Sequence, residues 1–258
     1  MEHVEGAIDH VARRLATAER VLFVTGAGLS ADSGLPTYRG LGGLYEDADT
    51  EEGIPIERAL SGPMFSARPD VTWRHVCRIE EACRGAEPND GHRAIAELEA
   101  IMKVVVLTQN VDGLHKSGGS TDVIDIHGDV LDLMCTMCSY RERVDSYAGM
   151  QVPPRCPDCR GLVRPDVVLF EEMLPVEKLS RLESELARGF DVALSVGTSS
   201  LFAYIAGPIS HLGARGCLTV EVNPGETEVS AVVDVIIREG AAATLRKIVD
   251  RTVALRAS

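Results

Sequence analysis

The sequence predicts an α/β fold in which a parallel sheet is interrupted by a smaller inserted domain. Short apolar runs alternate with helical patterns along most of the chain, which is typical of a buried parallel sheet with helices on both faces. Two Cys-x-x-Cys pairs interrupt this alternation. We therefore expect a Rossmann-like sheet domain and a smaller inserted domain that is partly helical and binds zinc. The sheet domain would comprise residues 1–39, 88–127 and 164–258, the helical insert residues 40–87, and the zinc module residues 128–163.

Composition narrows the class of protein. The 258 residues carry a formal net charge of −13 and are 45% hydrophobic, as in a globular protein. An acidic surface disfavours direct binding to nucleic acid or to an anionic membrane. It would suit a lysine-rich protein substrate, although simple solubility explains it equally well. No signal peptide and no apolar run of membrane-spanning length is visible, so we expect a cytoplasmic protein without a membrane partner.

The first strand leads into a glycine-rich turn. The apolar run 21–24 is followed by Gly26-Ala-Gly-Leu-Ser-Ala31, which fits G-x-G-x-x-A. Such glycines allow a tight turn and a close approach to a pyrophosphate at a helix N-terminus, although many such turns bind nothing. Ser33-Gly-Leu-Pro36 then ends the helix early. The loop that follows carries Tyr38 and Arg39, and it is either a lid over a ligand or an ordinary surface loop.

Two further strands also end in polar residues. The run 104–107 is followed by Gln109, Asn110 and Asp112, at the edge of the sheet where ligands bind. Asn and Asp also cap helices, and capping alone would explain them. The run 122–126 ends in His127, which could act as a base near neutral pH or be merely structural.

The cysteine pairs carry the strongest spacing signal. Cys135 and Cys138 form one pair, and Cys156 and Cys159 form the other after 17 intervening residues. Four thiolates close a tetrahedral zinc site and leave no open position, so one Zn²⁺ would be structural. Four reduced, metal-free cysteines are the alternative. The polar segment between the pairs predicts that zinc replaces a hydrophobic core there.

The remaining chain continues the α/β alternation. A strand is expected within 164–172, helices at 174–188 and 202–212, and strands at 191–196, 217–222 and 233–237, with a helix at the end. The turn Gly197-Thr-Ser199 and Asn223 follow two of these strands, where phosphate or ribose could be contacted.

Three strings together resemble the sirtuins, the NAD-dependent protein deacylases. They are G-A-G-x-S-A-x-S-G-L-P-T-Y-R-G at 26–40, T-Q-N-x-D-x-L-H at 108–115 and I-H-G-D at 126–129. The resemblance implies that Asp112 holds the nicotinamide carboxamide, and that Asn110 and Gln109 serve its ribose and a water. It implies His127 and Asn110 as catalytic residues. The implied NAD contacts are Gly26, Ala27, Gly28, Ser30, Ala31, Thr37, Tyr38, Arg39, Gln109, Asn110, Val111, Asp112, Gly197, Thr198, Ser199, Asn223 and Ala241.

The same resemblance implies the reaction. An acylated lysine would transfer its acyl group to ADP-ribose after nicotinamide leaves, with His127 taking a proton from a ribose hydroxyl. The string Arg164-Pro-Asp-Val-Val-Leu-Phe-Glu-Glu172 would pair with the substrate peptide through Val168, Phe170 and Glu171, although glycine is usual where Glu171 stands. Mono-ADP-ribosyl transfer to protein and a non-catalytic NAD sensor are the alternatives.

The expected acyl group depends on one helix. Parts of the chain resemble the desuccinylase and demalonylase branch, which reads an acyl carboxylate with a Tyr-x-x-Arg pair. Counting back from Pro88 places these positions at Val76 and Ile79, which would leave a carboxylate unpaired. We therefore expect a deacetylase, or a deacylase for other uncharged acyl groups. A shift of one residue would instead place His75 and Arg78 there.

Overall fold

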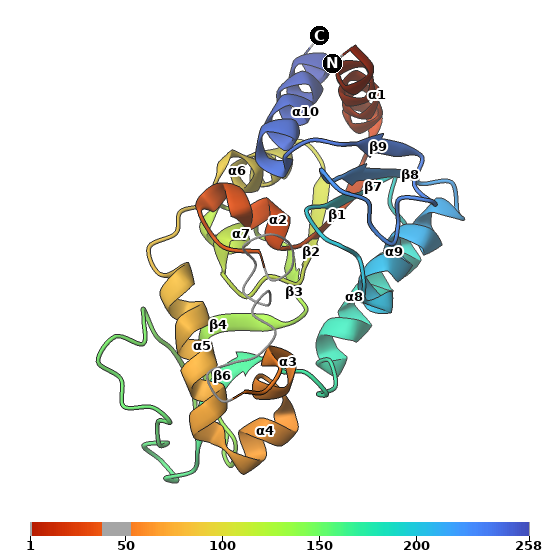
Figure 1. The fold of residues 1–258 in the computed structure, drawn as a ribbon. Coiled ribbons are helices and arrows are strands. Elements are labelled where there is room, and N and C mark those ends of the chain that lie inside the picture. Colours follow the sequence, from red (N-terminus) through yellow and green to blue (C-terminus); the bar gives the residue numbers. More distant parts are fainter. Residues whose placement is uncertain (1, 38–52, 258) are drawn as a thin grey trace.

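The chain folds around a six-stranded parallel sheet and a separate three-stranded antiparallel sheet (Figure 1). The computed structural model describes residues 2–37 and 53–257. The large sheet has the strand order β3-β2-β1-β7-β8-β9, which is the order of a Rossmann fold. Its strands are β1 (Arg20–Thr25), β2 (Lys103–Thr108), β3 (Val123–Asp125), β7 (Val192–Val196), β8 (Leu218–Val222) and β9 (Val235–Ile237).

Helices cover both faces of this sheet, because successive strand residues point to opposite sides. Val21 and Phe23 pack against one layer of helices, and Leu22 and Val24 pack against the other. The first layer is α1 (Glu2–Thr17), α6 (Asp90–Leu98) and α10 (Ala241–Arg256), and the second is α8 (Val176–Arg188) and α9 (Ala203–Gly213). The predicted α/β fold with a parallel sheet is therefore confirmed.

The small sheet begins directly after His127. Its strands are β4 (Gly128–Cys135), β5 (Arg141–Arg143) and β6 (Val163–Val167), in the order β5-β4-β6. A Cβ atom at Gly128 would lie 1.8 Å from the carbonyl oxygen of Asp166, and Gly128 has φ +88°. Only glycine fits where the chain crosses from one sheet to the other. Strand β6 spans the border that we expected at residue 164, and the division into domains stays a prediction.

The helices of the small domain share a core with its sheet. They are α3 (Ile56–Ala59), α4 (Gly62–Ala67) and α5 (Pro69–Cys83). Trp73 of α5 is 1% exposed and meets the ring of Tyr147 edge-on at 5.3 Å. Tyr147 lies in the segment between the cysteine pairs, which we expected to bury no core of its own. That segment borrows a core from α5, so zinc supplements hydrophobic packing there and does not replace it.

The two ends of the described chain lie beside each other at the end of the molecule remote from the small domain (Figure 1). Helix α10 packs along α1, where Arg251 forms salt bridges with Glu5 and Asp9. None of the described helices is both long and apolar enough to cross a membrane.

Candidate functional site

The site is built around two turns that meet at the centre of the large sheet. One turn follows β1 and opens the short helix α2 (Ala27–Ser30), and the other follows β7. Strand order reverses between β1 and β7, and ligands of open α/β sheets bind at such a switch point. The amide of Gly28 donates to the carbonyl oxygen of Gly197 at 2.8 Å, so the turns are bonded directly.

This contact explains the glycines of the first turn. A Cβ atom at Gly26 would lie 2.7 Å from Cβ of Thr198, and one at Gly28 would lie 2.8 Å from Cα of Gly197. Gly197 itself has φ +59°. From the sequence, we expected these glycines to allow the close approach of a pyrophosphate. Among the described residues, the group that approaches them is the backbone of the second turn.

Polar side chains after β2 close the site from a third direction. Asn110 donates from Nδ2 to the carbonyl oxygen of Gly26 and to the hydroxyl of Ser30, each at 3.1 Å. Ser30 donates in turn to Oδ2 of Asp112 at 2.7 Å. Gln109 donates to the hydroxyl of Thr198 at 2.7 Å. The structure therefore brings together residues that are 80 to 89 positions apart in the chain.

Two features of this network favour a polar ligand. Asn110 is 4% exposed, and its Oδ1 has no hydrogen-bond partner among the described residues. A buried acceptor without a partner costs free energy, and a bound group that donates a hydrogen bond would remove that cost. Burial raises the pKa of Asp112, while the amide of Leu114 and the hydroxyl of Ser30 act against this shift. The residues present thus fit a ligand with hydrogen-bond donors, such as a carboxamide and a ribose.

His127 lies where the two sheets meet and is held through both ring nitrogens. Nδ1 lies 3.1 Å from the carbonyl oxygen of Gln109, and Nε2 lies 2.7 Å from the hydroxyl of Tyr204. Burial, with a smaller effect from the charge of Lys178, lowers the pKa of His127 to about 4, although the hydrogen bond to the Gln109 carbonyl opposes this shift. The imidazole is therefore neutral at physiological pH, as a general base must be.

Sequence reasoning missed Tyr204. It stands in the first turn of α9, and its ring stacks on that of Phe202, with centroids 5.4 Å apart and planes 11° apart. The only local signal in the sequence was an aromatic residue in the helix that follows Gly197–Ser199, a turn at the edge of the sheet where ligands bind. That signal is weak, because aromatic residues on helices usually serve packing alone.

The other expected contact residues lie at the same edge of the sheet. Asn223, after β8, donates to the carbonyl oxygen of Thr198 at 3.1 Å. Ala241 is the first residue of α10, and the amide of its neighbour Ala242 is bonded by Asp32 of the 3₁₀ helix η1 (Ala31–Ser33). Ser199 is exposed, whereas Ala27, Thr37 and Val111 are half-buried. Tyr38 and Arg39 lie outside the described residues.

The segment expected to bind peptide runs from β6 toward α8. The amide of Val168 donates to the carbonyl oxygen of His127 at 2.9 Å, and the amide and carbonyl of Phe170 bond Leu60 and Gly62. Glu171 is exposed and has φ +66°, a conformation that glycine adopts without strain. Glu171 therefore holds a left-handed backbone conformation at a conformational cost, at the position where the resemblance led us to expect glycine.

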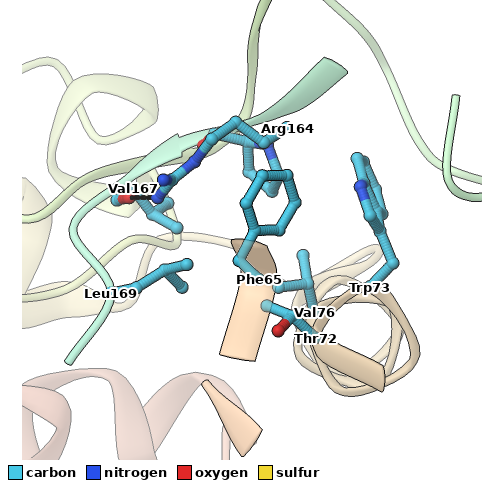
Figure 2. A pocket seen from close by; sticks show the side chains of 8 residues that line it. Phe65, Thr72, Trp73, Val76, Arg164, Val167 and Leu169 are labelled. Atoms are coloured by element: carbon cyan, nitrogen blue, oxygen red, sulfur yellow. Dashed lines mark hydrogen bonds between the residues drawn. The ribbon is translucent and has the colours of Figure 1, made fainter. Parts of the chain in front are cut away.

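A hydrophobic cluster lines the small domain beside this segment. Figure 2 shows Thr72, Trp73 and Val76 of α5 facing Phe65, Leu169 and the strand β6, and these side chains leave no space that a water molecule could enter. Arg164 lies over the ring of Phe65 at 5.1 Å. Its guanidinium donates to both carboxylate oxygens of Glu172, at 2.6 and 2.9 Å, so its charge is compensated within the chain.

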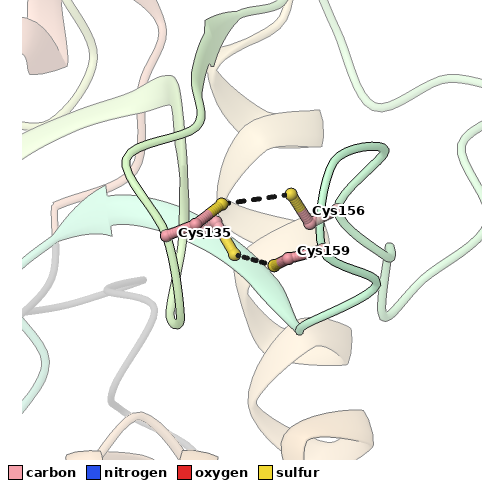
Figure 3. Close-up of side chains that lie close together, drawn as sticks. Cys135, Cys156 and Cys159 are labelled. Carbon is pink, nitrogen blue, oxygen red and sulfur yellow. Dashed lines mark hydrogen bonds between the residues drawn. The ribbon is translucent and has the colours of Figure 1, made fainter.

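The four predicted cysteines form a compact cluster (Figure 3). All four Sγ atoms lie within 4.8 Å of one another, with Cys135 and Cys159 3.4 Å apart and Cys138 and Cys156 3.6 Å apart. Zinc–sulfur bonds of about 2.3 Å in a tetrahedron require sulfurs roughly 3.8 Å apart. Burial opposes thiolate formation, but the backbone amides of Met137 and Cys138 lower the pKa of Cys135 to about 7. The donor set and its spacing fit one Zn²⁺.

The zinc site lies apart from His127. Cys135 ends β4 and His127 precedes its first residue, Gly128, so the length of the strand separates them. At about 3.3 Å per residue these eight residues span roughly 26 Å. The cluster therefore supports the fold of the small domain and takes no part in chemistry at His127.

Comparisons with known proteins agree with this geometry. The model of the Sir2 family matches residues 26–203. The chain is 50% identical to NAD-dependent protein deacylase 2 of Pseudomonas aeruginosa strain PAO1, over 88% of this chain and 90% of the relative. A Sir2 homologue solved in complex with NAD superposes with a TM-score of 0.86 at 34% identity, covering 95% of this chain and 94% of that one. A Sir2 protein solved with a deacetylated p53 peptide and 3′-O-acetyl ADP-ribose superposes with a TM-score of 0.83 at 26% identity, covering 94% and 97%.

Proposed function

The chain belongs to the Sir2 family, and we propose that it is an NAD-dependent deacylase of lysine side chains in proteins or peptides. The observation that carries the proposal is the junction at His127. A neutral imidazole stands beside a polar network in which the amide oxygen of Asn110 has no partner within the part of the chain that the structure describes. Bound NAD supplies the bond to nicotinamide that is broken and the ribose hydroxyl that receives the acyl group.

The residues of the chain have separate roles in this proposal. Nε2 of His127 accepts the proton of a hydroxyl, because the other nitrogen is occupied by the Gln109 carbonyl. Oδ1 of Asn110 and the carboxyl of Asp112 bind and orient hydrogen-bond donors. The turns at Gly26–Ser30 and Gly197–Ser199, together with Asn223 and Ala241, contact the remainder of the dinucleotide. The four cysteines hold a structural zinc.

The peptide would bind along the segment from Val168 to Glu171. Phe170 already uses its own amide and carbonyl within the chain, whereas the carbonyl of Val168 has no backbone partner among the described residues. This carbonyl is therefore available to a peptide amide or to the amide of an acylated lysine. We place the protein in the cytoplasm, since the zinc site needs four reduced cysteines and reducing compartments preserve them.

The acyl group is proposed to be acetyl or another uncharged group. Val76 is 2% exposed and belongs to the hydrophobic core of the small domain, with Ile79 packed against the same core. Arg164, the guanidinium that borders this core, is held by Glu172. A succinyl carboxylate placed against Val76 would lose its hydration without gaining a partner there.

One experiment tests both parts of the proposal. The purified protein is incubated with NAD and one peptide carrying either acetyl-lysine or succinyl-lysine, and peptide and nucleotide products are identified by mass spectrometry. We expect free lysine, nicotinamide and O-acetyl-ADP-ribose, with the higher kcat/KM on the acetyl peptide. ADP-ribose attached to protein in place of these products would refute deacylation. A tenfold preference for the succinyl peptide would refute only the acyl preference and would make Arg78 the residue to mutate.

A further inference from the structure

The bonding of His127 determines which of its nitrogens is basic. A carbonyl oxygen can only accept a hydrogen bond, so the nitrogen that faces Gln109, Nδ1, must carry the ring proton. In a neutral imidazole the other nitrogen, Nε2, then has a lone pair and no proton. Tyr204 faces that lone pair at 2.7 Å, and its hydroxyl must therefore be the donor.

The surroundings of Tyr204 keep it in this role. Burial raises the pKa of Tyr204 to about 12, so the hydroxyl keeps its proton at every pH where the protein would work. The ring is half-buried, stacks on Phe202 and packs against the core beneath α9. Phe202 also meets the His127 ring edge-on at 6.3 Å. The hydroxyl and the imidazole are thus both held by packed neighbours.

We propose that Tyr204 is a positioning residue for the base, whose hydroxyl holds the His127 ring so that unprotonated Nε2 faces the ligand-binding edge of the sheet. This inference rests on the proposed function of His127 as the base. The Gln109 carbonyl selects the tautomer, and the Tyr204 hydroxyl limits rotation of the ring about its bond to Cβ. During the reaction, the hydrogen bond from Tyr204 to Nε2 is replaced by one from the ribose hydroxyl whose proton His127 accepts.

The inference requires Tyr204 to affect one step of the reaction and not the other. Breaking the bond to nicotinamide needs no base, whereas moving a proton from a hydroxyl does. A tyrosine that only packs the protein would alter both steps together, through the stability of the fold. A positioning tyrosine alters the second step alone.

The test compares Tyr204→Phe with Tyr140→Phe. The first variant removes the hydroxyl at His127 and keeps the stacked ring. The second removes an exposed hydroxyl that is bonded to Glu142, away from His127. Two measurements are made: the ¹⁵N NMR signals of the His127 ring in the protein without NAD, and the single-turnover rates of nicotinamide release and of acyl transfer.

We expect wild-type His127 to show a protonated Nδ1 and an unprotonated, hydrogen-bonded Nε2. In Tyr204→Phe the Nε2 signal should move, and acyl transfer should slow about tenfold, a part of the ~10²–10⁴-fold that a general base contributes. Nicotinamide release should keep its wild-type rate in that variant. Tyr140→Phe should match the wild type in every measurement.

Three results would each overturn the inference. They are an Nε2 signal that does not move in Tyr204→Phe, equal losses in both rates, and acyl transfer that is as fast as in the wild type or faster. Should Tyr204→Phe fail to fold, a protonated Nε2 in the wild-type spectrum would still overturn it. If the wild type performs no NAD-dependent deacylation, the proposed function fails instead, and the NMR signals report on the Tyr204 bond independently.

Discussion

The contact between the two glycine turns makes a sharp prediction for Gly28→Ala. Gly28 has ordinary helical backbone angles in α2, so the substitution itself strains no dihedral angle. The added Cβ atom, however, would stand 2.8 Å from both Cα and the carbonyl oxygen of Gly197, where contacts below 3.0 Å essentially never occur. Both neighbours are backbone atoms, so the two turns must separate by several tenths of an ångström.

The cost follows from two effects. Overpacking of this kind costs about 1–3 kcal/mol. Lengthening the bond from the Gly28 amide to Gly197, now 2.8 Å, costs about 0.5–1.5 kcal/mol more. The sum is roughly 1.5–4.5 kcal/mol, which lowers the melting temperature of a chain this size by about 3–18 °C, at about 2–4 °C per kcal/mol. Separated turns should also bind ADP-ribose more weakly, because Thr198 and Ser30 move apart.

The assay is thermal unfolding followed by circular dichroism, with ADP-ribose binding measured by calorimetry. Gly207→Ala is the matched control, since no atom of residues 2–37 and 53–257 lies within 4 Å of a Cβ placed at Gly207 in α9. That control should be stabilised by about 0.5–1 kcal/mol, as expected for alanine replacing glycine in a helix. A Gly28→Ala protein whose melting temperature lies within about 1 °C of the wild-type value would refute the packing argument.

Three further predictions concern other parts of the structure. Cys135→Ser should lose the single bound zinc and unfold the small domain, because a structural zinc contributes on the order of 10 kcal/mol to the free energy of folding. The control Cys77→Ser should keep the zinc, and metal analysis with melting curves distinguishes the two variants. Glu171→Gly should raise the urea midpoint: releasing the strain at φ +66° gains about 1–2 kcal/mol, and the freer unfolded chain loses about 0.5–1 kcal/mol. A lower midpoint would show that Glu171 makes compensating contacts. Since burial lowers the pKa of His127 to about 4, kcat/KM should fall with acid only as pH approaches 4, and an acid limb near 6.5 would contradict the desolvated base.

The large sheet could be predicted because its signals are local. The runs 21–24 and 104–107 are apolar on both faces, and only a strand covered on both sides buries all of their residues. Each strand is one residue longer than its run at both ends, because β1 also includes Arg20 and Thr25 and β2 also includes Lys103 and Thr108. The cysteine spacing was equally informative, since two residues between ligands suffice to form a metal-binding knuckle.

What could not be predicted depends on contacts between distant segments. Tyr204 and His127 are 77 residues apart, and no spacing rule relates a helix residue to a histidine in another element. The packing of Gly26 and Gly28 against the turn after β7 likewise depends on two strands that are adjacent in space and not in sequence. The core beneath Tyr147 was missed for the same reason, because Trp73 comes from a helix that precedes the zinc module.

The position of His127 depends on both sheets. The small domain can therefore affect the base without contributing a side chain to the reaction. His127 is the last residue before β4, and its carbonyl accepts the amide of Val168, just after β6. At the other end of the same strand pair, Cys135 lies opposite Val163. The cysteine cluster therefore holds one end of the β4–β6 pair while His127 and the expected peptide segment share the other. We therefore expect loss of the cluster to free one end of the strand pair that carries His127 at its other end, roughly 26 Å away at about 3.3 Å per residue.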